Sequence, residues 1–161
     1  MKVLMLRTKK RSKHTNMSFK ETYATLNELI GTLHYRTSTK PVMSYRTEFR
    51  TFPSTASELY TQIIQWMEFL CALKIKKGDT ILLWGHNCPE WAIAYLGSVA
   101  HGVIVVPIDA TAQEDFVKKI QKEVAAKLLV KSRYLRTDLD LKTVNLEEVG
   151  YRIASFPARS T

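Results

Sequence analysis

Three polar side chains stand where two apolar runs of the sequence end. His86 and Asn87 follow the run 80–84, which reads Thr-Ile-Leu-Leu-Trp. Asp109 follows the run 103–108, which reads Val-Ile-Val-Val-Pro-Ile. An imidazole, an amide and a carboxylate placed there can hydrogen-bond a carboxylic acid or a nucleotide. A plainer interpretation is that His86 is a loop residue, Asn87 a helix cap and Asp109 a turn or cap residue. These residue types are common in such positions, so this interpretation is favoured over ligand binding.

The other reactive side chains form no recognisable catalytic or metal-binding set. Cys88 lies two residues from His86, but no second pair of ligands accompanies them, so we predict no metal site. No Ser-His-Asp or Cys-His arrangement can be inferred from spacing, and no catalytic residue is assigned. Cys71 and Cys88 are expected to be reduced, buried thiols.

The two apolar runs predict strands around a helix. Neither run alternates with polar residues, as is typical of strands buried on both faces of a parallel sheet. Between them, Asn87 as the cap and Glu90 three residues later predict a helix that ends at Gly102. A strand, helix and strand of this length build a right-handed βαβ unit.

A second helix and a third strand extend this unit. The run 111–114 has a capping-box pattern, and Ala126–Val130 reads as the next parallel strand. Four apolar residues of the helix are expected to face inward: Phe116, Val117, Ile120 and Val124. The fold class is therefore α/β, an open parallel sheet built from βαβαβ with helices on both faces, and 143–146 is a candidate edge strand.

Two further capping boxes begin amphipathic helices earlier in the chain. The pattern at Ser18–Glu21 predicts a helix to about Tyr35, and the pattern at Thr55–Glu58 predicts one that ends near Lys74. Residues 36–53, polar and proline-containing, are interpreted as a loop with short extended pieces such as 41–45.

The net charge of +9 is unevenly distributed. Residues 1–16 carry six basic and no acidic side chains, which leaves +3 for residues 17–161. We expect a disordered basic tail over 1–16, one α/β domain over 17–150 and a frayed end over 151–161. A start at Met17 would remove the tail.

The composition also bounds location and partners. No apolar run approaches the roughly 20 residues of a membrane span, so we expect a cytoplasmic protein with at most peripheral membrane contact. Short basic ends are usually solvated, which makes a nucleic-acid partner the less favoured interpretation.

The order and spacing of four motifs resemble a known superfamily, the adenylate-forming (AMP-binding) acyl- and aryl-CoA synthetases, and most of all proteins of the long-chain fatty-acid-CoA ligase type. The motifs, all within 19–149, are Tyr45-Arg-Thr-Glu-Phe-Arg-Thr-Phe52, Leu73-Lys-Ile-Lys-Lys-Gly-Asp79, Asn87-x-x-Glu90-Trp91 and Gly102-Val-Ile-Val-Val-Pro-Ile-Asp109. For an intact enzyme the resemblance implies ATP-dependent activation of a fatty or aromatic acid to an acyl-adenylate, followed by thioester formation, with ATP, Mg²⁺ and CoA as cofactors.

The catalytic motifs of that superfamily are not in this sequence. Its phosphate loop, its Tyr-Gly-x-Thr-Glu type motif, its ribose-binding Asp and its catalytic Lys come later in the family's order. Residues 97–102 formally begin a phosphate-binding loop, but Val103 and Ile104 follow where Lys and Ser or Thr are required. The resemblance therefore implies the N-terminal subdomain of such a ligase, inactive alone and without a cofactor of its own.

Three functions remain open on the sequence. The first is the N-terminal part of a ligase, whose partner is the missing C-terminal portion or another chain. The second is a stand-alone α/β binding or interaction module without catalysis. The third is a binder of RNA or phospholipid through the basic residues 2–13.

Overall fold

The computed structural model describes residues 23–35, 39–46 and 48–158. The expected basic tail, 1–16, and the capping-box pattern at 18–21 lie outside these residues. In chain order the elements are α1 (Leu26–His34), β1 (Pro41–Arg46), β2 (Thr51–Thr55), α2 (Ala56–Ala72), β3 (Thr80–Trp84), α3 (Pro89–Ala100), β4 (Ile104–Ile108), α4 (Glu114–Val124), β5 (Leu128–Lys131), β6 (Thr143–Asn145), a 3-10 turn (Leu146–Glu148) and α5 (Val149–Ile153).

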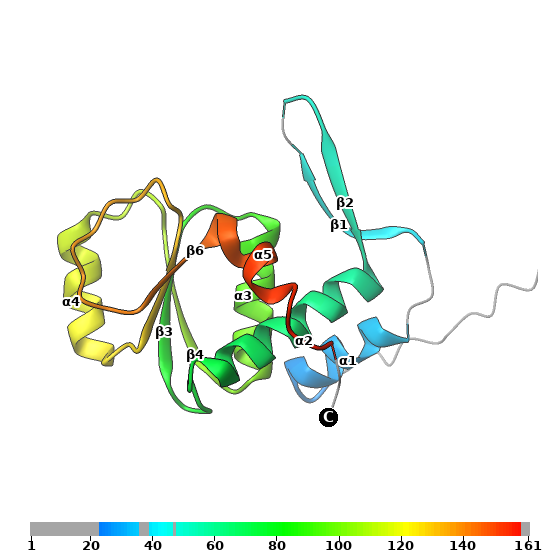
Figure 1. The fold of residues 1–161 in the computed structure, drawn as a ribbon, viewed down its shortest axis with the longest axis horizontal. Coiled ribbons are helices and arrows are strands. Elements are labelled where there is room, and N and C mark those ends of the chain that lie inside the picture. Colours follow the sequence, from blue (N-terminus) through cyan, green and yellow to red (C-terminus); the bar gives the residue numbers. More distant parts are fainter. Residues whose placement is uncertain (1–22, 36–38, 47, 159–161) are drawn as a thin grey trace, which may run out of the picture.

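Four parallel strands form the central sheet, in the order β4-β3-β5-β6 (Figure 1). The middle strands β3 and β5 are the most buried strands of this sheet, and Leu82 and Leu129 are fully buried opposite each other. The short run 143–145 forms the edge strand β6. The predicted α/β class and the open parallel sheet are confirmed.

Helices cover both faces of this sheet. On one face α2 and α3 pack over Ile81 and Leu83, joined by α1 and α5. On the other face α4 packs through Val117 onto Leu82, and the chain after β5 adds apolar side chains to the same cluster. A layer of helices on one face, and α4 with the chain after β5 on the other, therefore enclose the sheet, as the apolar, non-alternating strands require.

Helices α2 and α3 pack closely against each other in the larger core. Trp66 and Ser98 are both fully buried, and the indole Nε1 donates a 2.9 Å hydrogen bond to the Ser98 hydroxyl. A Cβ on Gly97 would come within 2.7 Å of the Trp66 ring. The two helices can approach so closely because this position has no side chain.

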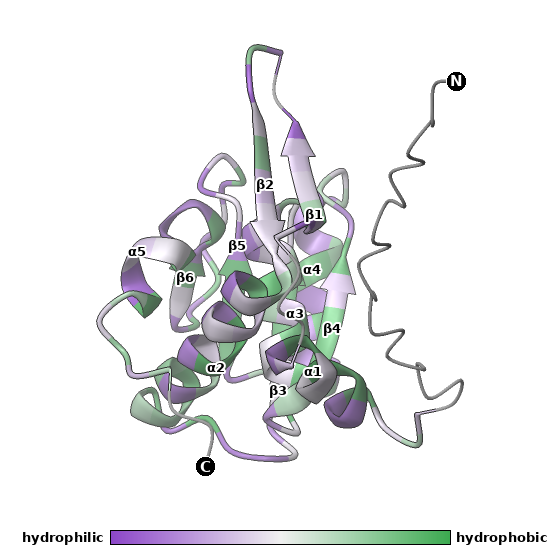
Figure 2. Cartoon of the chain, turned by 90° about the vertical axis from the view of Figure 1, so that its right-hand side faces the viewer, coloured by the Kyte–Doolittle hydropathy of each residue, from purple (hydrophilic) through white to green (hydrophobic). Residues whose placement is uncertain are grey.

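Two segments, 41–46 and 51–55, are more regular than the sequence suggested. We expected a loop with extended pieces, whereas β1 and β2 form an antiparallel hairpin in which Tyr45 lies opposite Phe52. The hairpin stands out from the rest of the molecule (Figures 1 and 2). The pattern was obscured by Pro53, since proline weakens the sequence signal of a strand.

The starts of three helices differ from the predicted ones. The cap of α3 is Cys88 instead of Asn87, and Cys88 Sγ accepts a 3.4 Å hydrogen bond from the Trp91 N–H. Helix α1 begins after the cap residue Thr25, with Tyr23 still before it. Helix α4 begins after Gln113, because the hydroxyl of Thr111 is bound to Asp109 instead.

Two further expectations are corrected, one about the burial of Phe116 and one about the end of the chain. Phe116 is 54% exposed, because the apolar stripe of α4 is narrow and centres on Val117. The chain after residue 150, which we expected to fray, continues α5 to the buried Ile153. Its next residues pack on α2, where the Gln65 amide donates a 3.0 Å hydrogen bond to the Phe156 carbonyl. Residues 159–161 lie outside the described part of the chain.

The capping box of α2 is confirmed and gives a testable contribution to stability. The Thr55 hydroxyl accepts from the Glu58 N–H at 3.3 Å, and the Glu58 carboxylate accepts from the Thr55 N–H at 2.8 Å. Thr55→Ala should therefore lower the free energy of unfolding by about 1 kcal/mol. The exposed Ser57, in the same turn, supplies the control: urea denaturation of Ser57→Ala should show no loss, and equal effects for both variants would refute the cap's contribution.

Within the residues that the structure describes, no helix is long and apolar enough to cross a membrane.

Candidate functional site

The carboxyl ends of the four parallel strands meet at one edge of the sheet, where β3 and β5 lie side by side. After β3 the chain turns to α3, on the face that carries α2. After β5 it turns to the opposite face, where Leu135, Leu139 and Leu141 pack. Neighbouring strands that diverge in this way open a crevice at their carboxyl ends, the usual ligand position in open α/β sheets.

A pocket of about 400 Å³ occupies this position, and we call it the edge pocket. Its lining comes from the chain after β3, the chain after β5, the 3-10 turn and the hairpin: Tyr45, His86, Asn87, Cys88, Glu90, Ser132, Tyr134, Leu146 and Glu147. The structure thus brings the predicted residues His86 and Asn87 together in one pocket. That placement gives them no role by itself, so their part in binding remains a prediction.

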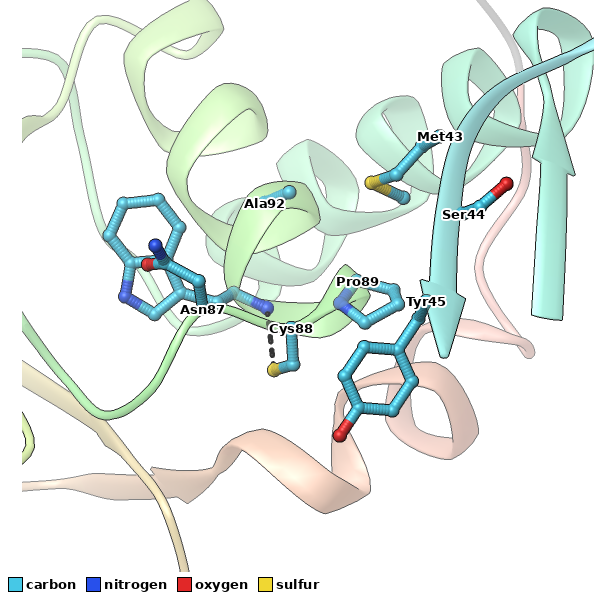
Figure 3. A pocket seen from close by; sticks show the side chains of 8 residues that line it. Met43, Ser44, Tyr45, Asn87, Cys88, Pro89 and Ala92 are labelled. Carbon is cyan, nitrogen blue, oxygen red and sulfur yellow. Dashed lines mark hydrogen bonds between the residues drawn. The ribbon is translucent and has the colours of Figure 1, made fainter. Parts of the chain in front are cut away.

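A second pocket, of about 360 Å³, adjoins the first, and we call it the groove pocket (Figure 3). It lies between β1 and the start of α3, and its lining is mostly apolar: Met43, Ser44, Tyr45, Asn87, Cys88, Pro89, Trp91 and Ala92. The ring of Trp91 stacks on Tyr95, with 5.2 Å between ring centroids. Tyr45, Asn87 and Cys88 line both pockets, so the two form one continuous depression with a polar and an apolar half.

Asp109 lies at the same edge but lines neither of these two pockets. Its carboxylate accepts hydrogen bonds from the Thr111 hydroxyl at 2.6 Å and from the Thr111 N–H at 2.7 Å. These bonds lower the pKa of Asp109, and the nearby His86 lowers it slightly further. Asp109 therefore closes a local turn, as the plainer interpretation expects, and its part in ligand binding remains a prediction.

Sequence reasoning missed the polar wall formed by Ser132 and Glu147. The Ser132 hydroxyl donates a 2.6 Å hydrogen bond to one oxygen of Glu147, and the Arg133 N–H donates one of 2.9 Å to the other. Partial burial, the largest single influence, raises the pKa of Glu147, but these hydrogen bonds together bring it below its ordinary value. The only sequence signal was a weak strand followed by two adjacent glutamates.

The thiol of Cys88 is not poised for nucleophilic chemistry. Burial raises its pKa to about 11, so the thiol is protonated at neutral pH. The expectation that both cysteines are buried is wrong for Cys71, which is exposed at the end of α2. The Nε2 atom of His101 lies 3.1 Å from the Ile75 carbonyl, so this nitrogen carries its proton and cannot accept one from Cys71.

The charges of the site do not suit a triphosphate. None of the described residues that line the two pockets is a lysine or an arginine. The ammonium of Lys131, at the end of β5, donates instead to the carbonyls of Ser132 and Leu135. Over the described ranges, no three His, Cys, Asp or Glu side chains are grouped to hold a metal ion. The site can shelter an apolar group and form hydrogen bonds, and ATP would need further residues.

Glu147 makes the stability of this wall dependent on pH. Because its pKa in the folded protein is lowered below the ordinary 4.5, the ionised carboxylate stabilises the fold above that pH and stops doing so as pH falls through the lowered pKa. Glu147→Gln should therefore be less stable than the parent protein at pH 7, and the difference should shrink below pH 4.5. Urea denaturation across this range measures it, with the exposed Glu123→Gln as control. A difference independent of pH would contradict this role.

Both the sequence and the fold of this chain are similar to those of known proteins. A family model described as AMP-binding enzyme matches residues 34–156. A D-alanine–D-alanyl carrier protein ligase from Bacillus anthracis is 35% identical over 74 residues, which are 44% of this chain and 15% of the relative. The crystal structure of a fatty acid AMP ligase from Legionella pneumophila superposes with a TM-score of 0.68 at 21% identity, over 84% of this chain and 26% of that one. The NpsA N-terminal subdomain from Klebsiella oxytoca superposes with a TM-score of 0.67 at 16% identity, over 83% of this chain and 35% of that one.

These proteins are much longer than the segment they share with this chain. The match spans about 15% of the curated relative and about 26% of the Legionella structure.

Proposed function

The chain belongs to the family of AMP-binding enzymes, and from this premise we propose that it is the N-terminal part of an adenylate-forming ligase. The match over residues 34–156 carries the proposal. Superposition on N-terminal subdomains and on ligases of that kind supports it at the level of the fold.

The proposed reaction of the intact enzyme activates a carboxylic acid with ATP. The carboxylate oxygen attacks the α-phosphorus of ATP, pyrophosphate leaves, and an acyl-adenylate forms. A thiol then takes the acyl group and releases AMP. We propose a fatty or aromatic acid as substrate and CoA as the thiol, with ATP and Mg²⁺ as cofactors. A D-alanine ligase among the relatives makes an amino acid with a carrier-protein thiol the main competing assignment.

The described residues of this chain do not fit ATP by themselves, so no step is assigned to them. The pockets offer His86, Asn87 and Ser132 as hydrogen-bonding groups, but they have no cationic group for the phosphates. The contribution we propose for this chain is one wall of the site, with the carboxyl edge of its sheet facing the rest of the enzyme. Alone it should not adenylate. A cytoplasmic location, where ATP is available, goes with this function.

The test is ATP–pyrophosphate exchange. The product that carries this sequence is captured from its own cells with an antibody to residues 55–73 and assayed with fatty acids, aromatic acids and D-alanine. We expect exchange that depends on one class of acid, and no exchange from the 161-residue chain alone. Captured product without exchange on any acid would overturn the proposal.

A binding module without catalysis is the second candidate. It is favoured by the exposed aromatic side chains of the hairpin, Tyr45, Phe49 and Phe52, which offer an interaction surface. It predicts a product of 18.5 kDa in cells that binds another chain and shows no exchange. Binding of RNA or phospholipid through residues 2–13 would instead fall steeply with salt and vanish when that segment is deleted.

A further inference from the structure

The outer edge of β1 runs along the groove pocket. Met43, Ser44 and Tyr45 are consecutive strand residues, so their side chains alternate between the two faces of the hairpin. All three nevertheless line the same pocket. The pocket therefore follows the edge of the strand. Figure 3 shows the same arrangement, with β2 on one side of β1 and the start of α3 on the other. Among the described residues, β1 pairs with β2 alone.

The register of the hairpin shows which backbone groups point into the groove. In an antiparallel ladder, opposite residues alternately exchange both hydrogen bonds or none. Ser44 lies opposite Pro53, which has no N–H and cannot take part in an exchange. The N–H and C=O of Ser44 therefore point away from β2, towards the groove, and those of Arg46 do the same two residues later.

The other free strand edges are less suited to pairing. The nitrogen of Pro53 points to the outer edge of β2, and proline has no N–H. The outer edge of β2 therefore lacks a backbone hydrogen-bond donor at its centre. On β4 the Ile104 N–H donates to the Asp79 carbonyl, so it points towards β3. Backbone groups alternate in direction along a strand, so those of Pro107, three residues later, point to the outer edge. Proline at an outer edge protects a strand against addition of another. Within β1 no proline follows Pro41, and the edge keeps its donors.

The far wall of the groove suits apolar side chains. Pro89, Trp91 and Ala92 line the pocket on the side of α3, and Trp91 is held in place by its stack on Tyr95. A strand edge beside an apolar pocket is the arrangement by which extended peptides add to a sheet: backbone hydrogen bonds supply affinity and the pocket selects side chains.

Resting on the proposed function, we propose that the edge of β1 receives an extended segment from the remainder of an AMP-binding enzyme, as a third strand with apolar side chains in the groove pocket. Enzymes of this family have much further sequence that could contain such a segment, since this chain matches only 15% of the Bacillus ligase and 26% of the Legionella ligase. An isolated two-stranded hairpin is marginally stable in water, and this one exposes 90% of Phe49 and 50% of Phe52.

Two features of the groove define the segment further. Helix α3 bounds the side of the groove opposite β1 (Figure 3), so we assign the groove to one extended segment and not to the two-stranded hairpin of a second copy. Glu90 and Glu147 line the adjoining edge pocket, so a basic residue beside the apolar ones is favoured.

The test places a photo-crosslinking amino acid, p-benzoylphenylalanine, at Ser44 in the protein made in its own cells. We expect a cross-linked peptide whose sequence belongs to the later part of an AMP-binding enzyme and alternates apolar with other residues. The same amino acid at Tyr151, 88% exposed on α5, is the control and should not capture this peptide.

A matched pair of substitutions tests the pocket itself. Ala92→Trp fills the groove and should reduce the Ser44 cross-link about tenfold, the effect of a binding loss near 1.4 kcal/mol. Ala154→Trp makes the same change at an exposed site on the end of α5 and should leave the yield unchanged. Circular dichroism and gel filtration of both variants check that each is folded before the cross-link yields are compared.

Any of four results would overturn the proposal: no cross-link at Ser44, a cross-link to a second copy, a cross-link to an unrelated peptide, or a yield that Ala92→Trp does not change. Capture of later AMP-binding sequence elsewhere on the chain but not at Ser44 would remove this docking edge and leave the proposed function standing. An 18.5 kDa product without exchange activity would remove the proposed function itself.

Discussion

Replacing Trp66 by alanine is expected to lower the free energy of unfolding by about 3–5 kcal/mol. The side chain is fully buried between α2 and α3, and its ring lies 5.3 Å from Phe69. Its loss leaves a cavity and leaves the buried hydroxyl of Ser98 without its 2.9 Å donor. Since domains of this size are stable by about 5–15 kcal/mol, Trp66→Ala should be only marginally folded at room temperature.

Urea denaturation followed by circular dichroism measures this effect, with two comparisons. Trp66→Phe keeps most of the ring volume and loses the hydrogen bond, so its destabilisation should be clearly smaller than that of Trp66→Ala. Tyr151→Ala removes an aromatic residue that is 88% exposed and should change stability by less than about 0.5 kcal/mol. A Trp66→Ala protein as stable as the Tyr151→Ala protein would mean that α2 and α3 do not pack as described.

The second large effect is expected at Gly97. A Cβ at this position would lie 2.7 Å from the Trp66 ring and 3.1 Å from the Ile63 carbonyl, and backbone atoms yield less readily than a side chain. Gly97→Val should therefore force α2 and α3 apart and cost about 1–3 kcal/mol.

Gly31 provides the matched control for Gly97. It also lies within a helix, α1, and a Cβ there would meet nothing within 4 Å. Gly31→Val should leave stability about unchanged, since valine is no worse a helix former than glycine and its Cβ meets no neighbour there. Combining Gly97→Ala with Trp66→Phe tests the contact directly: the two effects should not add, because the smaller ring makes room for the new methyl group. Additive effects would place the strain elsewhere.

Much of the fold follows from local patterns in the sequence. The runs 80–84 and 103–108 are apolar without alternation, and they became central and edge strands of a parallel sheet. The capping box at Thr55 fixed the start of α2 correctly, because both of its hydrogen bonds are made within one turn. Residues that interact within four positions of each other leave a trace that a sequence can show.

What the sequence did not show depends on tertiary contacts. The hairpin was missed because its strands are stabilised by pairing with each other, and Pro53 disguises one of them. Cys88 caps α3 although cysteine is a rare cap, since Pro89 sets the helix start one residue later than Asn87 implied. The order of residues 151–158 comes from Ile153 and Phe156, which dock on α2 in a contact between distant segments.

In the candidate site, too, some features could be predicted from the sequence and others could not. The edge on which His86 and Asn87 lie was predictable, because parallel strands place their carboxyl ends together. The pairing of Ser132 with Glu147 was not, since these residues are far apart in sequence and meet only because β5 and β6 are neighbours. Asp109 was expected at this edge and lies there, but it bonds to Thr111 outside the two pockets.

The most direct test of the account is the intact mass of the cellular product that carries this sequence, captured with an antibody to residues 55–73. If the chain is the N-terminal part of an adenylate-forming ligase, the mass should be several times 18.5 kDa, as the length of the relatives implies, and the product should exchange pyrophosphate into ATP when its acid is present. A product of 18.5 kDa without exchange would contradict the account and would favour the binding module.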